Sequence, residues 1–208
     1  MTVPEEWKHG LESDTPPAPY ATDGSDYRGA LRYHYVVALK RFLKFFPVFV
    51  VLWVQLYVFQ RDYLLPLGIV GMLGAVWTLI LYVGRVSSTR KCAKAFRTYP
   101  LAFRTPVEKI GMESTHTLYL RFGDQQGTPF TLRAKDALGR GRWPVGITDG
   151  VWFAGDEPFG GAMIVPGGGE LLFLQPRDWT AREEDRAGAG PERIEKAKRA
   201  GTHRPARR

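Results

Sequence analysis

The residues best suited to bind a ligand lie in one stretch of the C-terminal half, where aromatic side chains alternate with acids and glycines. From residue 142 to residue 161 the chain reads RWPVGITDGVWFAGDEPFGG. Aromatic rings beside carboxylates could line a groove for a ligand or partner. The same residues also suit core packing and tight turns, where aspartate caps and glycine relieves crowding. Both interpretations stay open for the candidate binding residues Trp143, Asp149, Trp152, Asp156 and Phe159.

Arrangements typical of catalysis are missing from the sequence. The glycines at 155, 160 and 161 are not followed by the Lys-Ser/Thr pair of a phosphate-binding loop, and the four histidines are scattered. The adjacent acids Asp156 and Glu157 point apart, unlike a glycosidase pair. A single cysteine, Cys92, excludes a disulfide framework, and its basic neighbours predict a lowered thiol pKa. We therefore expect no enzyme activity, no cofactor and no metal site.

The middle of the chain predicts a membrane hairpin. Residues 45–84 contain Arg61 and Asp62 as their only charged groups, and they separate two apolar runs at about 42–60 and 63–84. A helix needs roughly 20 apolar residues to cross the hydrocarbon core of a bilayer. A soluble hairpin of this composition would have to be buried on every face, and the rest of the chain is too small for that.

Small residues recur at helical spacing along the second apolar run. Such a stripe lets another helix backbone approach closely. Packing against the first run and contact with a second copy of the chain are both open. The predicted packing residues are Gly68, Gly71, Gly74, Ala75 and Thr78.

The net charge of +8 is concentrated around the apolar block. An acidic leader, 1–27, is expected to be disordered, and basic juxtamembrane helices are expected at 28–44 and 85–100. The excess of Lys and Arg on these flanks predicts a multi-pass protein of the cell (inner) membrane with both termini in the cytoplasm. The flanking basic groups are expected to face anionic lipid headgroups rather than nucleic acid. They are Arg28, Arg32, Lys40, Lys44, Arg90, Lys91 and Lys94.

Beyond the basic collar the hydrophobic period changes from helical to alternating. Residues 101–179 predict a small cytoplasmic antiparallel β module, a barrel or a sandwich, and the polar tail 180–208 contains one short helix at 191–200. The fold class is thus a membrane α-helical hairpin of two transmembrane helices, a β module and a C-terminal helix. Strands are expected at 106–110, 117–122, 129–134, 150–154, 162–166 and 170–175.

One pattern in the β module resembles a known family. Trp143-Pro144, the run from Asp149 to Asp156, Phe159-Gly-Gly and Pro166-Gly167 are similar to a family of uncharacterised small actinobacterial two-span integral membrane proteins. The resemblance implies a membrane location and no particular site residues.

We predict a non-enzymatic, membrane-tethered cytoplasmic binding or scaffold module with an unidentified protein partner. One alternative is a small-ligand sensor or enzyme that uses the Trp143–Phe159 region. The other is an accessory subunit of a transport or secretion complex. A homo-oligomer is compatible with each of these functions.

Overall fold

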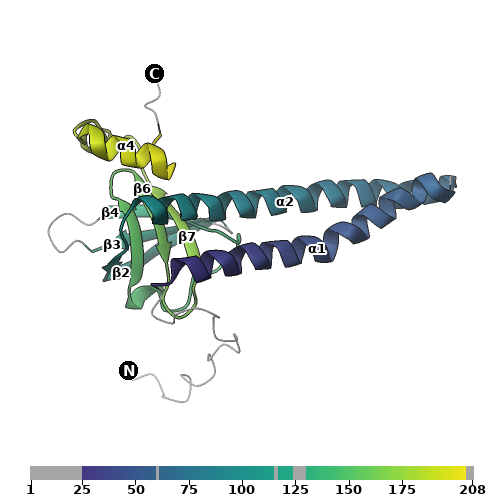
Figure 1. Cartoon of the computed structure of the whole chain (residues 1–208), viewed down its shortest axis with the longest axis horizontal. Coiled ribbons are helices and arrows are strands. Elements are labelled where there is room, and N and C mark those ends of the chain that lie inside the picture. Colours follow the sequence, from purple (N-terminus) through teal and green to yellow (C-terminus); the bar gives the residue numbers. More distant parts are fainter. Residues whose placement is uncertain (1–24, 60, 115–116, 124–129, 205–208) are drawn as a thin grey trace, which may run out of the picture.

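Two long helices project from a β module as a hairpin (Figure 1). The structure is a computed structural model that describes residues 25–204, except 60, 115–116 and 124–129. Most of the expected acidic leader therefore lies outside the described residues. The order of elements, hairpin first, then sheet, then C-terminal helix, confirms the predicted fold class.

The hairpin consists of helix α1 (Tyr27–Phe59), a short 3₁₀ turn (Asp62–Leu64) and helix α2 (Leu65–Thr98). Pro66 lies in the first turn of α2, where its missing N–H costs nothing. Helix α2 ends where Tyr99 becomes extended before Pro100, because a proline disfavours helical geometry in the residue ahead of it. The helical stretches expected at 28–44 and 85–100 are the parts of α1 and α2 nearest the β module, each continuous with an apolar span.

Both hairpin helices are long and apolar enough to cross a membrane. In the most apolar 18-residue stretch of each helix, 0% of α1 and 17% of α2 is buried inside the protein. These side chains therefore do not form the core of a soluble domain. Large hydrophobic residues are exposed along both helices, as in Val51, Tyr57, Leu73 and Trp77. A surface of this kind is stable when lipid covers it.

The two helices pack closely where glycines of α2 meet large residues of α1. A Cβ atom on Gly71 would lie 2.5 Å from the backbone nitrogen of Trp53 and 2.8 Å from the carbonyl oxygen of Phe49. Gly74 lies against the ring of Phe49 in the same way. Glycine therefore sets the distance between the helix axes here. Of the other predicted packing residues, Gly68 and Ala75 are buried and Thr78 is half-buried.

Within the described residues, the module is a seven-stranded antiparallel sheet in the order β1-β5-β6-β7-β4-β3-β2, curled into a half-barrel. The six expected strands are present, the one at 117–122 with the expected bounds and the other five with shifted ends. The edge strand β1 was not expected from the sequence, because three residues are too few to show an alternating pattern. The strands are β1 (Ala102–Arg104), β2 (Val107–Ser114), β3 (Thr117–Phe122), β4 (Phe130–Asp136), β5 (Val151–Asp156), β6 (Gly160–Ile164) and β7 (Leu171–Pro176).

The sheet is covered on both faces, and strand β7 shows how. Leu171 and Phe173 pack with Cys92 and Phe96 of α2, whereas the alternate residues of β7 face the inside of the half-barrel. A strand buried on both faces needs a continuous apolar sequence, as β7 has. Helix α2 thus supplies one layer of the core of the module.

The C-terminal tail folds back onto α2. Helix α4 (Pro191–Ala200) has the bounds expected from the sequence, with proline in its first turn and Gly201 in left-handed geometry at its end. Ala197 and Ala200 of α4 are buried. The five-residue helix α3 (Glu183–Ala187) precedes it and was not expected.

The close approach at Gly71 predicts a large difference between two alanine substitutions on the same helix. Gly71→Ala should destabilise the hairpin by about 1–3 kcal/mol, because the added methyl group meets the α1 backbone. Gly84→Ala places the same methyl group in open space and should not destabilise it. The stability of both variants is measured by titrating the full chain from mild detergent into dodecyl sulfate and monitoring the loss of tertiary structure. Equal transitions for the two variants would contradict the assigned packing.

Candidate functional site

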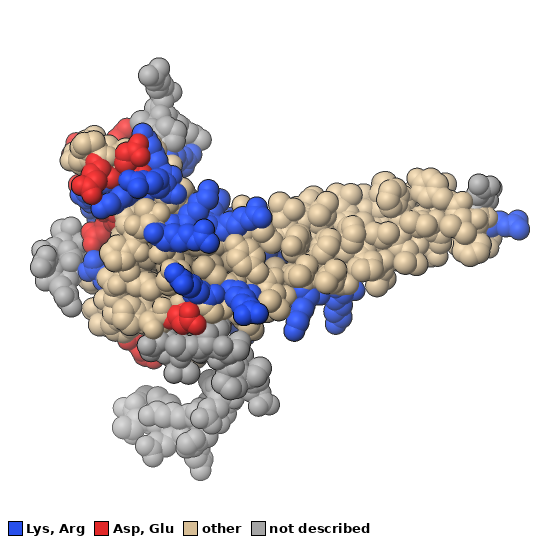
Figure 2. All heavy atoms as spheres, in the orientation of Figure 1, with Lys and Arg blue, Asp and Glu red and all other residues tan. Residues whose placement is uncertain are grey.

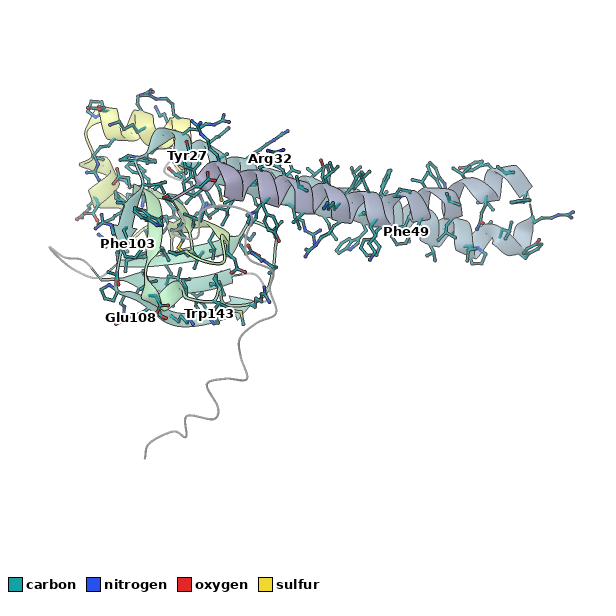
Figure 3. The ribbon with its side chains drawn as sticks, turned by 60° about the horizontal axis from the view of Figure 1, so that its bottom comes forward. Tyr27, Arg32, Phe49, Phe103, Glu108 and Trp143 are labelled. Carbon is teal, nitrogen blue, oxygen red and sulfur yellow. The ribbon has the colours of Figure 1, made fainter. Side chains whose placement is uncertain are left out.

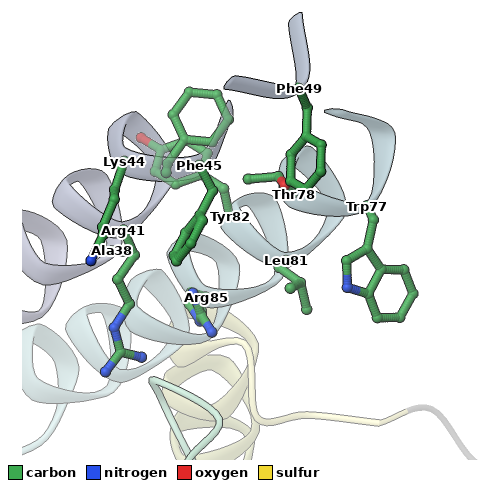
Figure 4. A pocket seen from close by; sticks show the side chains of 11 residues that line it. Ala38, Arg41, Lys44, Phe45, Phe49, Trp77, Thr78, Leu81, Tyr82 and Arg85 are labelled. Carbon is green, nitrogen blue, oxygen red and sulfur yellow. The ribbon is translucent and has the colours of Figure 1, made fainter. Parts of the chain in front are cut away.

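A groove opens between the two helices close to the β module (Figure 4). Its volume is about 530 Å³, and its lining comes from both helices. The end toward the module carries Arg41, Lys44 and Arg85, and the end toward the tip of the hairpin carries Phe49, Trp77 and Thr78. The groove is therefore amphipathic, with cations at one end and aromatic surface at the other.

The three cations of the groove form no salt bridge with any residue that the structure describes. Among the described residues, no carboxylate oxygen lies within 4.0 Å of the charged groups of Arg41, Lys44 or Arg85. Partial burial and the nearby positive charge of Arg41 lower the pKa of Arg85, whereas the negative charge of Asp136 opposes that shift. Arg85 Nε donates a hydrogen bond of 3.2 Å to the carbonyl oxygen of Leu138, which orients its guanidinium group. Like charges held close without a counterion are the usual arrangement of an anion site.

Arg41 and Arg85 were missed by the sequence analysis as a pair. They lie on different helices, and only the hairpin geometry brings them to the same end of the groove. The available signal was that each one borders an apolar run on the flank away from the turn at Arg61 and Asp62. Figure 2 shows basic side chains gathered where the helices meet the module, with the apolar length of the hairpin beyond them.

Most of the basic residues expected to face lipid lie outside the groove. Lys44 lines the groove, but Lys91 lies over the ring of Phe173 of β7, and Arg28 lies over the ring of Tyr27. The second of the expected basic helices thus also forms a layer of the module core, through Cys92 and Phe96. The remaining members of the set are exposed on α1 and α2 without lining the groove: Arg32, Lys40, Arg90 and Lys94.

Next to the groove, an ionic cluster joins the loop after β4 to the start of β7. Asp136, at the end of β4, accepts hydrogen bonds from the backbone nitrogen and Nε of Arg140 at 2.6 and 3.0 Å. Arg140 in turn pairs with Glu170 at 2.8 Å, and Arg142 approaches the same carboxylate at 3.6 Å. Burial raises the pKa of Glu170, and its two arginine partners oppose that shift. The cluster holds the loop after β4 against the start of β7.

Helix α1 contributes a buried histidine to this junction. His34 is 1% exposed, and its Nδ1 donates a hydrogen bond of 2.8 Å to the carbonyl oxygen of Ala30. Burial, helped by the positive charge of Arg140, lowers the pKa of His34 to about 4, whereas the Ala30 hydrogen bond and Asp136 oppose that shift. The imidazole is therefore neutral at neutral pH.

The prediction of a lowered thiol pKa for Cys92 is wrong. The side chain is fully buried beneath the sheet, and burial raises its pKa to about 12. The basic neighbours in sequence point away from it, because a helix places consecutive residues on different faces. The thiol is inert packing material.

Two of the five residues proposed as a binding cluster line one pocket. Asp149 and Trp152 border an open pocket of about 550 Å³ together with Phe103, Gly146, Gly150 and Pro166. The rings of Phe103 and Trp152 meet edge to face, with centroids 5.3 Å apart. Phe103 is 47% exposed, although it lies on the edge strand β1. No pattern in the sequence indicated Phe103, because its strand is too short to show alternation.

The other three residues of that set lie apart from this pocket. Trp143 packs against the inner core of the half-barrel, and Figure 3 shows it and Phe103 at separate places on the module. Asp156 accepts two hydrogen bonds from Arg193 of α4, at 2.6 and 2.9 Å. Phe159 is buried beneath the same C-terminal segment. These residues fix the core and the tail rather than a common site.

Comparison with models of known protein families, with curated proteins and with solved structures finds no match to this chain. The resemblance to an actinobacterial two-span family therefore stays a prediction. Among the residues that the structure describes, no group of three or more His, Cys, Asp or Glu side chains is placed to hold a metal ion. Geometry and charge are thus the grounds for a functional proposal.

The buried His34 predicts that acid weakens the junction. The unfolded chain binds the imidazole proton near pH 6.5 and the folded chain only near pH 4, so stability present above pH 6.5 is lost as the pH falls toward 4. The loss should approach about 3 kcal/mol. Urea unfolding of the full chain in detergent at pH 7.5 and pH 4.5 measures it.

His34→Leu removes the titrating group and should reduce this loss by most of that amount. Glu170, whose raised pKa has the opposite sign of effect, contributes equally to both proteins and cancels in the difference. An unchanged pH dependence in the variant would contradict the assignment to His34.

Proposed function

We propose that the chain is a membrane-anchored binding module without catalytic activity of its own. The hairpin crosses the membrane with its turn outside, and the β module and both termini lie in the cytoplasm. The excess of basic residues on the module side of both spans supports this orientation, because the turn carries Arg61 alone. The module then works as a docking surface at the inner membrane face.

The observation that carries this proposal is the continuity of helix α2. It runs without interruption from Leu65 at the tip to Thr98, and its last turns pack against strands β5, β6 and β7. A flexible linker would be sufficient to keep a domain near a membrane. A module built around the end of a spanning helix is held at one orientation, which serves a surface that must meet its partner at a set angle and distance.

The pocket formed by Phe103, Asp149 and Trp152 is the surface that best fits a partner. Exposed aromatic side chains are typical anchors of protein interfaces. Asp149 is exposed at the rim and adds one negative charge. The pocket therefore suits a protein segment in which an apolar side chain lies beside a lysine or arginine.

A small-ligand sensor is the second candidate. The pocket volume of about 550 Å³ lies within the range of small-molecule sites, and its lining is mainly apolar with one carboxylate. An apolar ligand with a cationic group would use the same contacts as the protein segment.

The topology predicts the accessibility of two engineered thiols. Arg61→Cys should react with a membrane-impermeant maleimide on intact cells, whereas Lys135→Cys on the module should react only after lysis. Cys92 is fully buried and can stay in place. Labelling of position 61 only after lysis would contradict the proposed orientation.

The partner surface is tested by a photo-crosslinking residue at position 103 in native membranes. We expect a protein adduct whose yield falls at least about fivefold when Asp149→Arg reverses the rim charge, since a close charge pair at an interface is worth 1–2 kcal/mol or more. Glu195→Arg makes the same charge change on α4, outside the pocket, and should leave the adduct unchanged. An adduct insensitive to Asp149→Arg would contradict a basic partner segment.

A further inference from the structure

The groove between the helices lies at a definite depth if the hairpin spans a bilayer. At about 1.5 Å of rise per residue, Arg41 is about 27 Å along α1 from Phe59, and Arg85 is about 30 Å along α2 from Leu65. The hydrocarbon core of a bilayer is about 30 Å thick. The charged end of the groove thus falls at the headgroups of one leaflet, and the aromatic end falls among the acyl chains.

We propose that this groove binds one anionic glycerophospholipid. Its phosphate contacts Arg41, Lys44 and Arg85, and one acyl chain follows the apolar part of the groove along Phe45, Phe49 and Trp77. The inference rests on the proposed function, because it places the hairpin in the membrane.

Charge complementarity identifies the occupant. Three cations line one groove with no carboxylate oxygen within 4.0 Å among the described residues, so an anion bound there would be attracted by all three. The Arg41 side chain has no hydrogen-bond partner among the residues that the structure describes, so its guanidinium donors are open to a ligand there. A soluble anion would use only the charged end, and it would leave the aromatic end of an approximately 530 Å³ groove unfilled.

The site also connects lipid to the β module. Arg85 donates to the carbonyl oxygen of Leu138, two residues after Asp136 of the ionic cluster. A phosphate on Arg85 therefore lies one side chain away from the loop after β4. An anion in the groove offsets the repulsion between Arg41 and Arg85. It therefore favours the arrangement in which Arg85 donates to Leu138.

The experiment uses the full chain in mixed micelles with equal amounts of dioleoyl phosphatidylglycerol and dioleoyl phosphatidylcholine, and native mass spectrometry counts the lipids retained. The wild-type chain should retain one phosphatidylglycerol in preference to phosphatidylcholine. Arg41→Gln should lower this preference about fivefold, because one basic contact to an anionic headgroup is lost. Lys40→Gln removes the same charge from the neighbouring, exposed position and should change the preference by less than about twofold.

Two further arms keep the result decisive. The double variant Arg41→Gln with Arg85→Gln should abolish the preference for phosphatidylglycerol. Helical content, measured by circular dichroism, checks that the Arg41→Gln variant is folded. Glycerol 3-phosphate, which lacks acyl chains, should not displace the bound lipid at equal concentration. Equal effects of Arg41→Gln and Lys40→Gln, or displacement by glycerol 3-phosphate, would overturn the lipid site.

Failure of the site is separable from failure of the proposed function. External labelling of Arg61→Cys without any lipid preference overturns the lipid site and leaves the membrane-anchored module intact. Labelling of that position only after lysis overturns the proposed orientation, whatever the lipid preference.

Discussion

Helix α2 has to satisfy two environments along a single rod, and the rest of the molecule depends on how it does so. Its first part exposes large apolar side chains such as Leu73 and Trp77, which are stable against lipid. Its last part buries Cys92 and Phe96 against the sheet. Helix α2 is one continuous helix, so its two parts have a fixed orientation relative to each other. The position of the sheet relative to the hairpin is therefore determined by the backbone of α2.

The change of environment happens at one level of the molecule, and the polar chemistry gathers there. Arg41 and Arg85 face the groove at that level, and the Asp136–Arg140–Glu170 cluster lies immediately beyond it. Charged groups cannot move toward the apolar end without losing hydration, and they cannot enter the module core without a partner. The groove cations keep their solvent or ligand, whereas the cluster satisfies its members internally.

The elements of this fold could largely be anticipated from pattern alone. The two apolar runs, the six alternating strands and the helix at 191–200 each carry a local signal, in which period and length distinguish helix from strand. Strand β1 has no such signal, because it is three residues long and is a strand only through its pairing with β5. The packing of residues 85–98 against the sheet was equally hidden, since the sequence of a basic, mixed helix does not show which element it will pack against.

The candidate binding site could be predicted from the sequence far less well than the secondary structure. The aromatic and acidic residues between Trp143 and Phe159 looked like one cluster because they are close in sequence, but strand geometry sends neighbours to opposite faces and loops separate the rest. Trp143 and Phe159 pack in the core, and Asp156 pairs with Arg193. Asp149 and Trp152 line a pocket together with Phe103. The sequence by itself determined the apolar hairpin, the basic flanks and the alternating strands, because these depend on composition and local period. Tertiary structure alone decided that Arg41 meets Arg85 and that Phe103 meets Trp152, because contacts between distant segments depend on how whole elements pack.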